Sequence, residues 1–299
     1  MVLILLFVAF LLSGCSEDNA SKNTAEYLKF TLGTAVDSVQ LGTTYSNIII
    51  AADSASSLCE YSIDGETYTP VPFDNNGLVS FSADTNTIYF KGDCRNSGGS
   101  IAYMFDEAFP DNSVQLSGSI LAIMGGEPLT TVNSMFSGTF YKSRLTEIPA
   151  DLFAGISGEP KENMFFDTFA FNKLASIPDG LFSGISGAPA EGAFGQTFYN
   201  TPYLNKIGDL GMDITESTVD ESVYSAMFGV AGRDESVTEI TVPEGGLINL
   251  FTEPGNKFTS LVELYNGNEN GAFSDYSALG MDGWSTKYSD YNAIPDSWK

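Results

Sequence analysis

The chain has 299 residues and carries 38 acidic against 13 basic side chains, so its formal net charge at neutral pH is −25. A surface of this sign repels phosphate groups, which argues against a nucleic-acid partner and against docking on anionic lipid through protein side chains. The length is sufficient for two modules with a substantial core.

The chain begins with an apolar run over residues 1–14 that is too short for a permanent membrane-spanning helix. The run leads into Leu12-Ser13-Gly14-Cys15, which resembles the lipobox of bacterial lipoproteins. The resemblance implies a signal peptide over residues 1–14 and lipid attachment at Cys15; an ordinary secretory signal is the alternative. Residues 15–25 are polar and without periodicity, so we expect a flexible tether.

The acidic residues that follow Cys15 resemble the signal that sends some lipoproteins to the outer face of the outer membrane. We therefore expect a lipid-anchored protein of the bacterial outer membrane that is exposed at the cell surface. The lipid would be its only contact with the membrane.

Residues 26–98 contain short β-type runs separated by turn residues. Residues 27–32 alternate in polarity, residues 48–50 are all isoleucine, and Asp64-Gly65 joins two strand-like runs as in a hairpin. Further runs occupy residues 79–81 and 87–92. This spacing predicts a small β-sandwich-like module.

Cys59 and Cys94 are the only cysteines besides Cys15, and both lie in this module. An isolated pair in an exported protein favours a disulfide, with two buried free thiols as the alternative. No further thiol and no histidine is present to complete a zinc site.

A repeated pattern occupies the middle of the chain. Residues 145–169 contain Leu-x-x-Ile-Pro, Leu-Phe-x-Gly-Ile-Ser-Gly and Met-Phe-x-x-Thr-Phe, and residues 174–198 repeat most of these positions 29 residues later. Its marker Met-Phe begins at Met104, Met135, Met164, Ala193 (a variant) and Met227. A fixed period of this kind is typical of a repeat architecture, in which stacked neighbours bury one another's apolar faces.

The two phenylalanines of each marker stand at positions i and i+4, which share one face of a helix. Leu-x-x-Ile-Pro predicts a brief strand that ends at proline. The predicted fold class is therefore α+β: a small N-terminal β-sandwich-like module followed by a short solenoid of short strands plus short helices. The aromatic stripe is predicted to be core.

The pattern Phe169-x-x-Asn172-x-Leu174-x-x-Ile177-Pro178 resembles the BspA-like leucine-rich repeats of bacterial surface proteins. The resemblance covers about residues 99–265 and implies a leucine-rich-repeat solenoid that acts in adhesion. Ser143, Asn172 and Thr201 stand where those repeats often carry cysteine or a small polar residue.

Residues 266–299 are rich in glycine, asparagine, aspartate and aromatic residues, and we expect a C-terminal cap. The alternative is a glycan-binding platform, because tryptophan and tyrosine offer rigid faces with polar edges. Its residues would be Trp284, Tyr288, Tyr291 and Trp298.

The absence of histidine removes the commonest general base and metal ligand. The sequence also lacks a Gly-x-Ser-x-Gly elbow in a strand–helix context and a phosphate-binding glycine-rich loop. We predict a protein that is not an enzyme and has neither a cofactor nor a metal site. A carboxylate pair for glycoside cleavage is the remaining catalytic hypothesis, because 38 acidic residues always offer pairs.

The sequence thus predicts a non-enzymatic surface lipoprotein for adhesion or protein–protein interaction, with host or neighbouring-cell surface and matrix proteins as partners. This functional prediction rests on resemblance of the fold and not on an identified functional site. The alternative is a glycan-binding accessory lipoprotein for polysaccharide capture. The oligomeric state and any dependence on Ca²⁺ stay open.

Overall fold

The computed structural model describes residues 26–41, 58–72, 79–109, 112–214 and, apart from residues 225, 230 and 233, 223–243. The predicted signal peptide, tether and C-terminal cap lie outside these residues, as do Cys15, Trp284, Tyr288, Tyr291 and Trp298. Nowhere in the described part does a helix reach the length and hydropathy that a membrane crossing requires.

The described residues form strands and turns, with one 3-10 turn, η1 (Ile120–Ile123), and no α-helix. The strands are β1 (Leu28–Leu41), β2 (Cys59–Ser62), β3 (Thr69–Pro70), β4 (Val79–Gly92), β5 (Val114–Gly118), β6 (Leu129–Thr130), β7 (Leu145–Glu147), β8 (Ile156–Ser157), β9 (Ser176–Ile177), β10 (Ser186–Gly187), β11 (Lys206–Ile207) and β12 (Asp213–Ile214). The predicted α+β class with a helical leucine-rich-repeat solenoid is therefore wrong.

The N-terminal strands belong to one mixed sheet with the order β3-β2-β4-β1-β5-β7. Strand β1 is antiparallel to both β4 and β5, whereas β5 is parallel to β7 in the first repeat. The predicted separate sandwich is also wrong, since this sheet continues across residues 98 and 99 into the repeats. The larger of two buried hydrophobic clusters in the described residues runs from Leu28 to Ile240.

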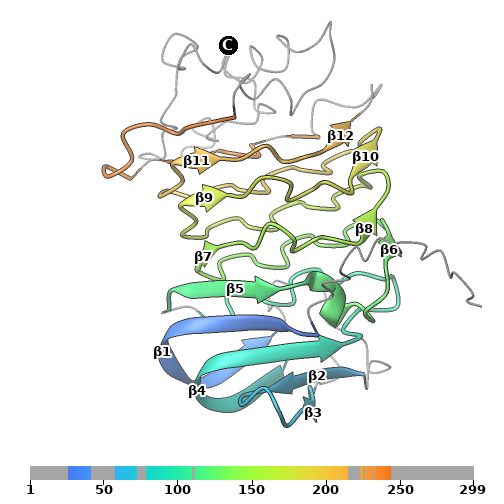
Figure 1. The fold of residues 1–299 in the computed structure, drawn as a ribbon, viewed down its shortest axis with the longest axis vertical. Helices are drawn as coiled ribbons and strands as arrows, with labels where there is room; N and C mark the ends of the chain where they lie inside the picture. The colour runs from blue at the N-terminus through green and yellow to red at the C-terminus, as the bar shows by residue number, and fades with distance from the viewer. Residues whose placement is uncertain are drawn as a thin grey trace, which may run out of the picture.

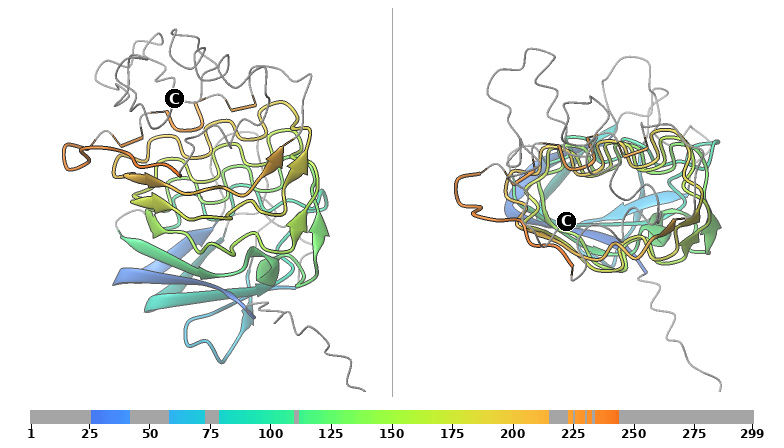
Figure 2. Two further views of the ribbon diagram at one scale, coloured as in Figure 1. Left: turned by 45° about the horizontal axis from the view of Figure 1, so that its top comes forward. Right: turned by 90° about the horizontal axis from the view of Figure 1, so that it is seen from above.

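After β5 the chain winds in coils that lie on top of one another (Figure 1). Short parallel pairs join successive coils at two corners: β9 with β11 on one side, and β6 with β8 and β10 with β12 on the other. Seen from above, the coils superpose as an elongated ring whose side chains fill the interior (Figure 2).

The segments predicted as helices form the side of each coil that lacks these strands, and we name residues 100–109, 134–143, 163–172 and 192–201 the turn wall. Every fourth residue here has a left-handed backbone, as at Ser134, Gly138 and Lys142 with φ of 51°, 58° and 52°. Two of every four backbone amides in the turn wall donate a hydrogen bond to a carbonyl oxygen of the next coil. Examples are Phe136 N to Met164 O at 2.9 Å and Gly138 N to Phe166 O at 2.7 Å. These bonds offset the cost of the left-handed residues, which strands and helices avoid.

Small polar side chains donate hydrogen bonds to backbone carbonyl groups inside the turn wall. Thr168 Oγ1 donates to Phe136 O of the previous coil at 2.8 Å, and Asn172 Nδ2 donates to Phe140 O at 2.7 Å. Ser143 and Thr201 are also fully buried and donate to backbone carbonyls. A buried carbonyl without such a donor would be costly, which explains the small polar residues in the repeat.

The N-terminal sheet is also tied covalently. Cys59, the first residue of β2, forms a disulfide with Cys94, two residues beyond β4, and the two Cα atoms lie 4.6 Å apart. The bond fixes the end of the β2–β4 pair, which borders the candidate site.

Candidate binding site

The outer face of the N-terminal sheet carries three tyrosines and two lysines, which we name the tyrosine patch: Tyr27, Tyr68, Tyr89, Lys29 and Lys91. Successive residues of a strand point to opposite faces. In β1 and β4 the buried residues Leu28, Phe30, Ile88 and Phe90 therefore alternate with half-buried residues of the patch. Lys29 and Tyr89 are direct cross-strand neighbours.

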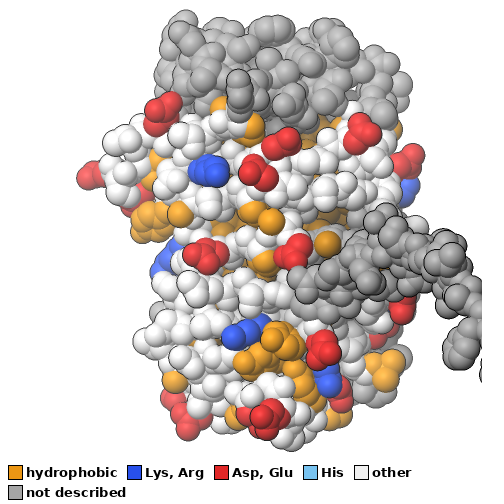
Figure 3. Space-filling view, in the orientation of Figure 1, with side chains coloured by type: hydrophobic (Ala, Val, Ile, Leu, Met, Phe, Trp, Pro, Cys, Tyr) orange, Lys and Arg blue, Asp and Glu red, His pale blue; other side chains and the backbone are white. Residues whose placement is uncertain are grey.

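Close contacts hold the rings of the patch in place. The rings of Tyr27 and Tyr89 meet edge to face with centroids 5.0 Å apart, and Lys91 Nζ lies 3.7 Å from the centre of the Tyr68 ring. Figure 3 shows hydrophobic side chains gathered beside basic and acidic ones over the N-terminal sheet, at the lower end of the view. The patch is thus a rigid surface of mixed character.

The loop after β2 brings Tyr68 to the patch. Asp64 Oδ1 accepts hydrogen bonds from the amides of Glu66 and Thr67, both at 2.8 Å, and from Ser62 Oγ at 2.8 Å. These bonds, the two backbone bonds first, hold the pKa of the Asp64 carboxyl well below its usual range. Burial raises the pKa of Tyr68, and its neighbours Tyr27 and Tyr89 add to the rise.

A groove of about 760 Å³ adjoins the patch, and we name it the charged groove. It lies between the ends of β2 and β4 and the turn that follows η1. Its charged residues are Glu26, Glu60, Lys91, Asp93, Arg95 and Glu127, and its other residues are Leu58, Gly92, Ala122, Met124, Gly125, Gly126 and Leu129. Lys91 belongs to both the patch and the groove, so the two form one continuous surface.

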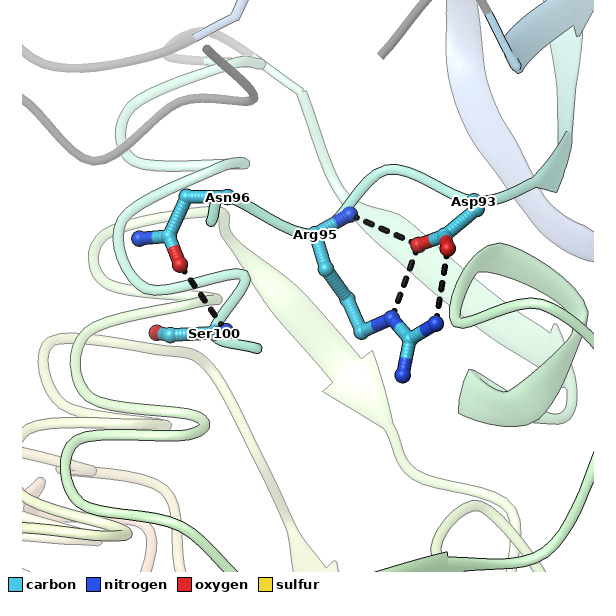
Figure 4. A network of polar contacts seen from close by, with 4 residues as sticks. All are labelled: Asp93, Arg95, Asn96 and Ser100. Carbon is cyan, nitrogen blue, oxygen red and sulfur yellow. Dashed lines mark hydrogen bonds and ion pairs between the residues drawn. The ribbon is translucent and has the colours of Figure 1, made fainter. Parts of the chain in front are cut away.

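The shorter of the two ion pairs described among the groove residues joins Arg95 to Asp93 (Figure 4). Arg95 Nε donates to Asp93 Oδ1 at 2.8 Å, and its terminal nitrogen donates to Asp93 Oδ2 at 2.7 Å. The side-chain hydrogen bonds lower the pKa of Asp93 and raise the pKa of Arg95. Two parallel bonds of this kind fix both side chains, so Arg95 is a positioned group and not a freely rotating one.

The segment after Arg95 fastens the groove to the turn wall. Asn96 Oδ1 accepts from the amides of Gly98 at 2.9 Å and Ser100 at 3.0 Å, and Ser100 Oγ donates to Ser134 O of the next coil at 2.7 Å. Figure 4 shows the Asn96 side chain turned toward Ser100. The groove therefore stands on a rigid base.

The turn that follows η1 contributes two successive glycines to the rim of the groove, directly beside the Asp93–Arg95 pair. Gly125 and Gly126 have φ of 88° and 78°, a backbone conformation that favours glycine. A Cβ added at Gly126 would meet no atom within 4 Å. The backbone at Gly126 is thus open to close approach by another molecule, whereas an added Cβ at Gly125 would lie 3.3 Å from a terminal nitrogen of Arg95.

A second polar cluster lies on the outside of the turn wall. The ring of Tyr103 covers Gly138, where an added Cβ would collide with it. Asp106 is buried nearby; Asp167 is half-exposed as a residue, but its Oδ1 atom is shielded from solvent and has no hydrogen-bond partner in the described structure. Burial, and then the charge of Asp106, raise the pKa of Asp167 to about 7. The raised pKa of Asp167 predicts a pH dependence of stability.

The sequence analysis did not identify this candidate surface. The predicted glycan residues Trp284, Tyr288, Tyr291 and Trp298, and the lipid site Cys15, lie outside the described residues. The disulfide between Cys59 and Cys94 borders the groove. Among the residues that the structure describes, no three acidic or cysteine side chains come together in a way that could hold a metal ion. The sequence signal that could have indicated this surface is the alternation of tyrosine and lysine with buried residues in β1 and β4.

Comparison of the chain with protein-family models, with curated proteins and with solved structures finds no match.

Proposed function

We propose that this protein is a non-enzymatic surface lipoprotein that binds another protein, in adhesion or in a protein–protein contact at the cell surface. The BspA-like pattern and the lipobox-like Leu12-Ser13-Gly14-Cys15 support the proposed location at a bacterial cell surface. The tyrosine patch is the observation that carries the proposal. Tyrosines in rigid, partly desolvated clusters are enriched among the residues that dominate binding energy at protein interfaces.

The scaffold also supports a binding role. Backbone hydrogen bonds join each coil to the next, and the Phe30 ring beneath the patch packs against Phe105 and Phe140, so the patch sits on a well-packed base. A preorganised surface loses little conformational entropy on binding, which favours affinity.

The test is a binding screen of the full chain, purified in non-ionic detergent, against extracellular-matrix and plasma proteins. A partner that binds the wild type should bind the Tyr27→Ala/Tyr68→Ala variant at least about tenfold more weakly, which is typical of the loss of interface hot spots. Tyr203→Ala is the matched control, because Tyr203 is 41% exposed and lies outside the patch. Equal binding by both variants would remove the patch from the proposal.

Glycan binding is the second candidate function. The observation that favours it is the group of three tyrosine rings beside Lys29 and Lys91, since aromatic faces with polar neighbours suit sugar rings. A polysaccharide that binds the wild type and is lost in the Tyr27→Ala/Tyr68→Ala variant would support this candidate. Loss in Trp284→Ala and Trp298→Ala alone would point instead to the C-terminal aromatic residues.

A further inference from the structure

We infer that the charged groove receives a positively charged, extended segment of the partner protein, with a lysine or arginine side chain between Glu26 and Glu127. The inference rests on the proposed function and names the chemistry of the partner.

The charges of the groove do not cancel. It contains four carboxylates, Glu26, Glu60, Asp93 and Glu127, against two cations. Both cations are already engaged: Arg95 with Asp93, and Lys91 with Glu60 at 3.7 Å and with the Tyr68 ring. An anionic partner would have to break these contacts.

Glu26 and Glu127 are the carboxylates left over. Both are exposed, and neither forms an ion pair with another described residue. A cationic side chain in the groove would be attracted by these two carboxylates without disturbing an existing pair. The net charge of −25 acts in the same direction, because it attracts a basic partner from a distance at low salt.

The shape of the groove favours an extended segment. Gly126 leaves part of the rim without a side chain, and an added Cβ there would meet no atom within 4 Å, so a peptide backbone can approach the protein backbone closely at this point. Leu58 is 64% exposed and Leu129 is partly exposed in the same groove. These two residues offer an apolar contact for the aliphatic stem of a lysine or for a small apolar neighbour.

The probe is a fluorescein-labelled octapeptide of alternating lysine and alanine, with an alternating glutamate–alanine peptide as its negative control. Binding to the full chain in non-ionic detergent is followed by fluorescence anisotropy at two salt concentrations. The lysine peptide should bind, more weakly at high salt, and the glutamate peptide should not.

Two variants separate the groove from the overall charge. Glu26→Gln/Glu127→Gln removes two charges from the groove, and Glu191→Gln/Glu239→Gln removes two from exposed positions on later coils. We expect the groove variant to raise Kd about fivefold and the control variant less than twofold, in keeping with two partly exposed charge contacts. Equal effects of the two variants, or no binding of the lysine peptide, would overturn the inference.

The partner protein found in the binding screen completes the test. If its binding falls in the tyrosine variant but is unchanged in Glu26→Gln/Glu127→Gln, the proposed function stands and the groove assignment fails. If the screen finds no protein partner, the proposed function fails, whereas selective peptide binding would still place a cation-binding groove at Glu26 and Glu127.

Discussion

Phe105 stacks on Phe140: the ring centroids lie 5.6 Å apart and the planes differ by 6°. The stack continues through Phe169, Phe198 and Phe228 at 5.5 to 5.6 Å. Phe105 thus pairs with the second phenylalanine of the next marker and not with the first, Phe136. The turn wall has a four-residue period, so a shift by one turn preserves the pattern and is invisible in the sequence.

The stack makes each inner ring, such as Phe140, part of two interfaces between coils. Phe140→Ala should lower the free energy of unfolding by about 3–5 kcal/mol, because it leaves a cavity between Phe105 and Phe169. Phe171→Ala, on the outer side of the turn wall and only partly buried, should cost less than half as much. Denaturant unfolding followed by circular dichroism measures both. Similar losses would contradict the assignment of Phe140 to the interior.

The Asp167 carboxyl predicts a fall in stability between about pH 4 and pH 7. Its pKa in the folded protein is raised to about 7, first by burial and then by Asp106, above the ordinary value near 4. In this window the folded state binds more protons than the unfolded state, so the free energy of unfolding decreases as pH rises.

The check is the pH dependence of the melting temperature. Asp167→Asn should flatten the curve between pH 4 and pH 7 and raise the melting temperature at pH 7. Asp213→Asn, at an exposed position, is the control and should leave the curve as in the wild type. A wild-type curve that rises through this window in the same way as the Asp167→Asn curve would refute the prediction.

The disulfide closes a loop with a sequence separation of 35 residues between Cys59 and Cys94. In the chain-entropy model, Cys59→Ser/Cys94→Ser should lower the free energy of unfolding by about 3–4 kcal/mol. Reduction of the wild type by dithiothreitol should produce the same loss, measured by urea unfolding. Identical stability in the oxidised and reduced protein would show that the bond does not constrain the chain.

Lipid anchoring through Cys15 is tested by cell fractionation. Cys15→Ala should move the protein from the membrane fraction to the soluble or secreted fraction, because the protein would lose its acyl chains. Ser16→Ala, one residue further on, is the control and should stay in the membrane fraction. Retention of the Cys15→Ala variant in the membrane fraction would contradict the lipoprotein hypothesis.

Local patterns anticipated the strands of the N-terminal sheet. The alternation over residues 27–32 lies within β1 from residue 28 on, the run at 87–92 lies within β4, and the Asp64-Gly65 turn follows β2. The prediction of a separate module was wrong about the residues against which those strands pack. Leu28 and Phe30 face the same core as Phe105 and Phe109, and this long-range contact has no local signature.

The helix prediction failed for a different physical reason. Apolar residues at i and i+4 suit both one face of a helix and a chain of four-residue turns. The hydrogen bonds of the backbone amides distinguish the two structures. The Phe140 amide, for example, donates to Thr168 O in the next coil at 3.0 Å and not to a carbonyl of its own unit. The left-handed residues Ser134 and Lys142 are not glycines, so the usual sign of such turns was missing.

The candidate site could not be predicted because it joins distant segments. Glu26 precedes β1, Lys91 ends the outer face of β4, and Glu127 follows η1. Their proximity depends on the β1–β4 pairing and on the bridge between Asp93 and Met124.

Hydrogen–deuterium exchange of the full chain, with and without a protein partner from the binding screen, tests the central claim most directly. If the tyrosine patch and charged groove form the binding surface, the partner should slow exchange at residues 58–68, 89–95 and 124–129. Protection confined to the turn wall, with none at these residues, would contradict it.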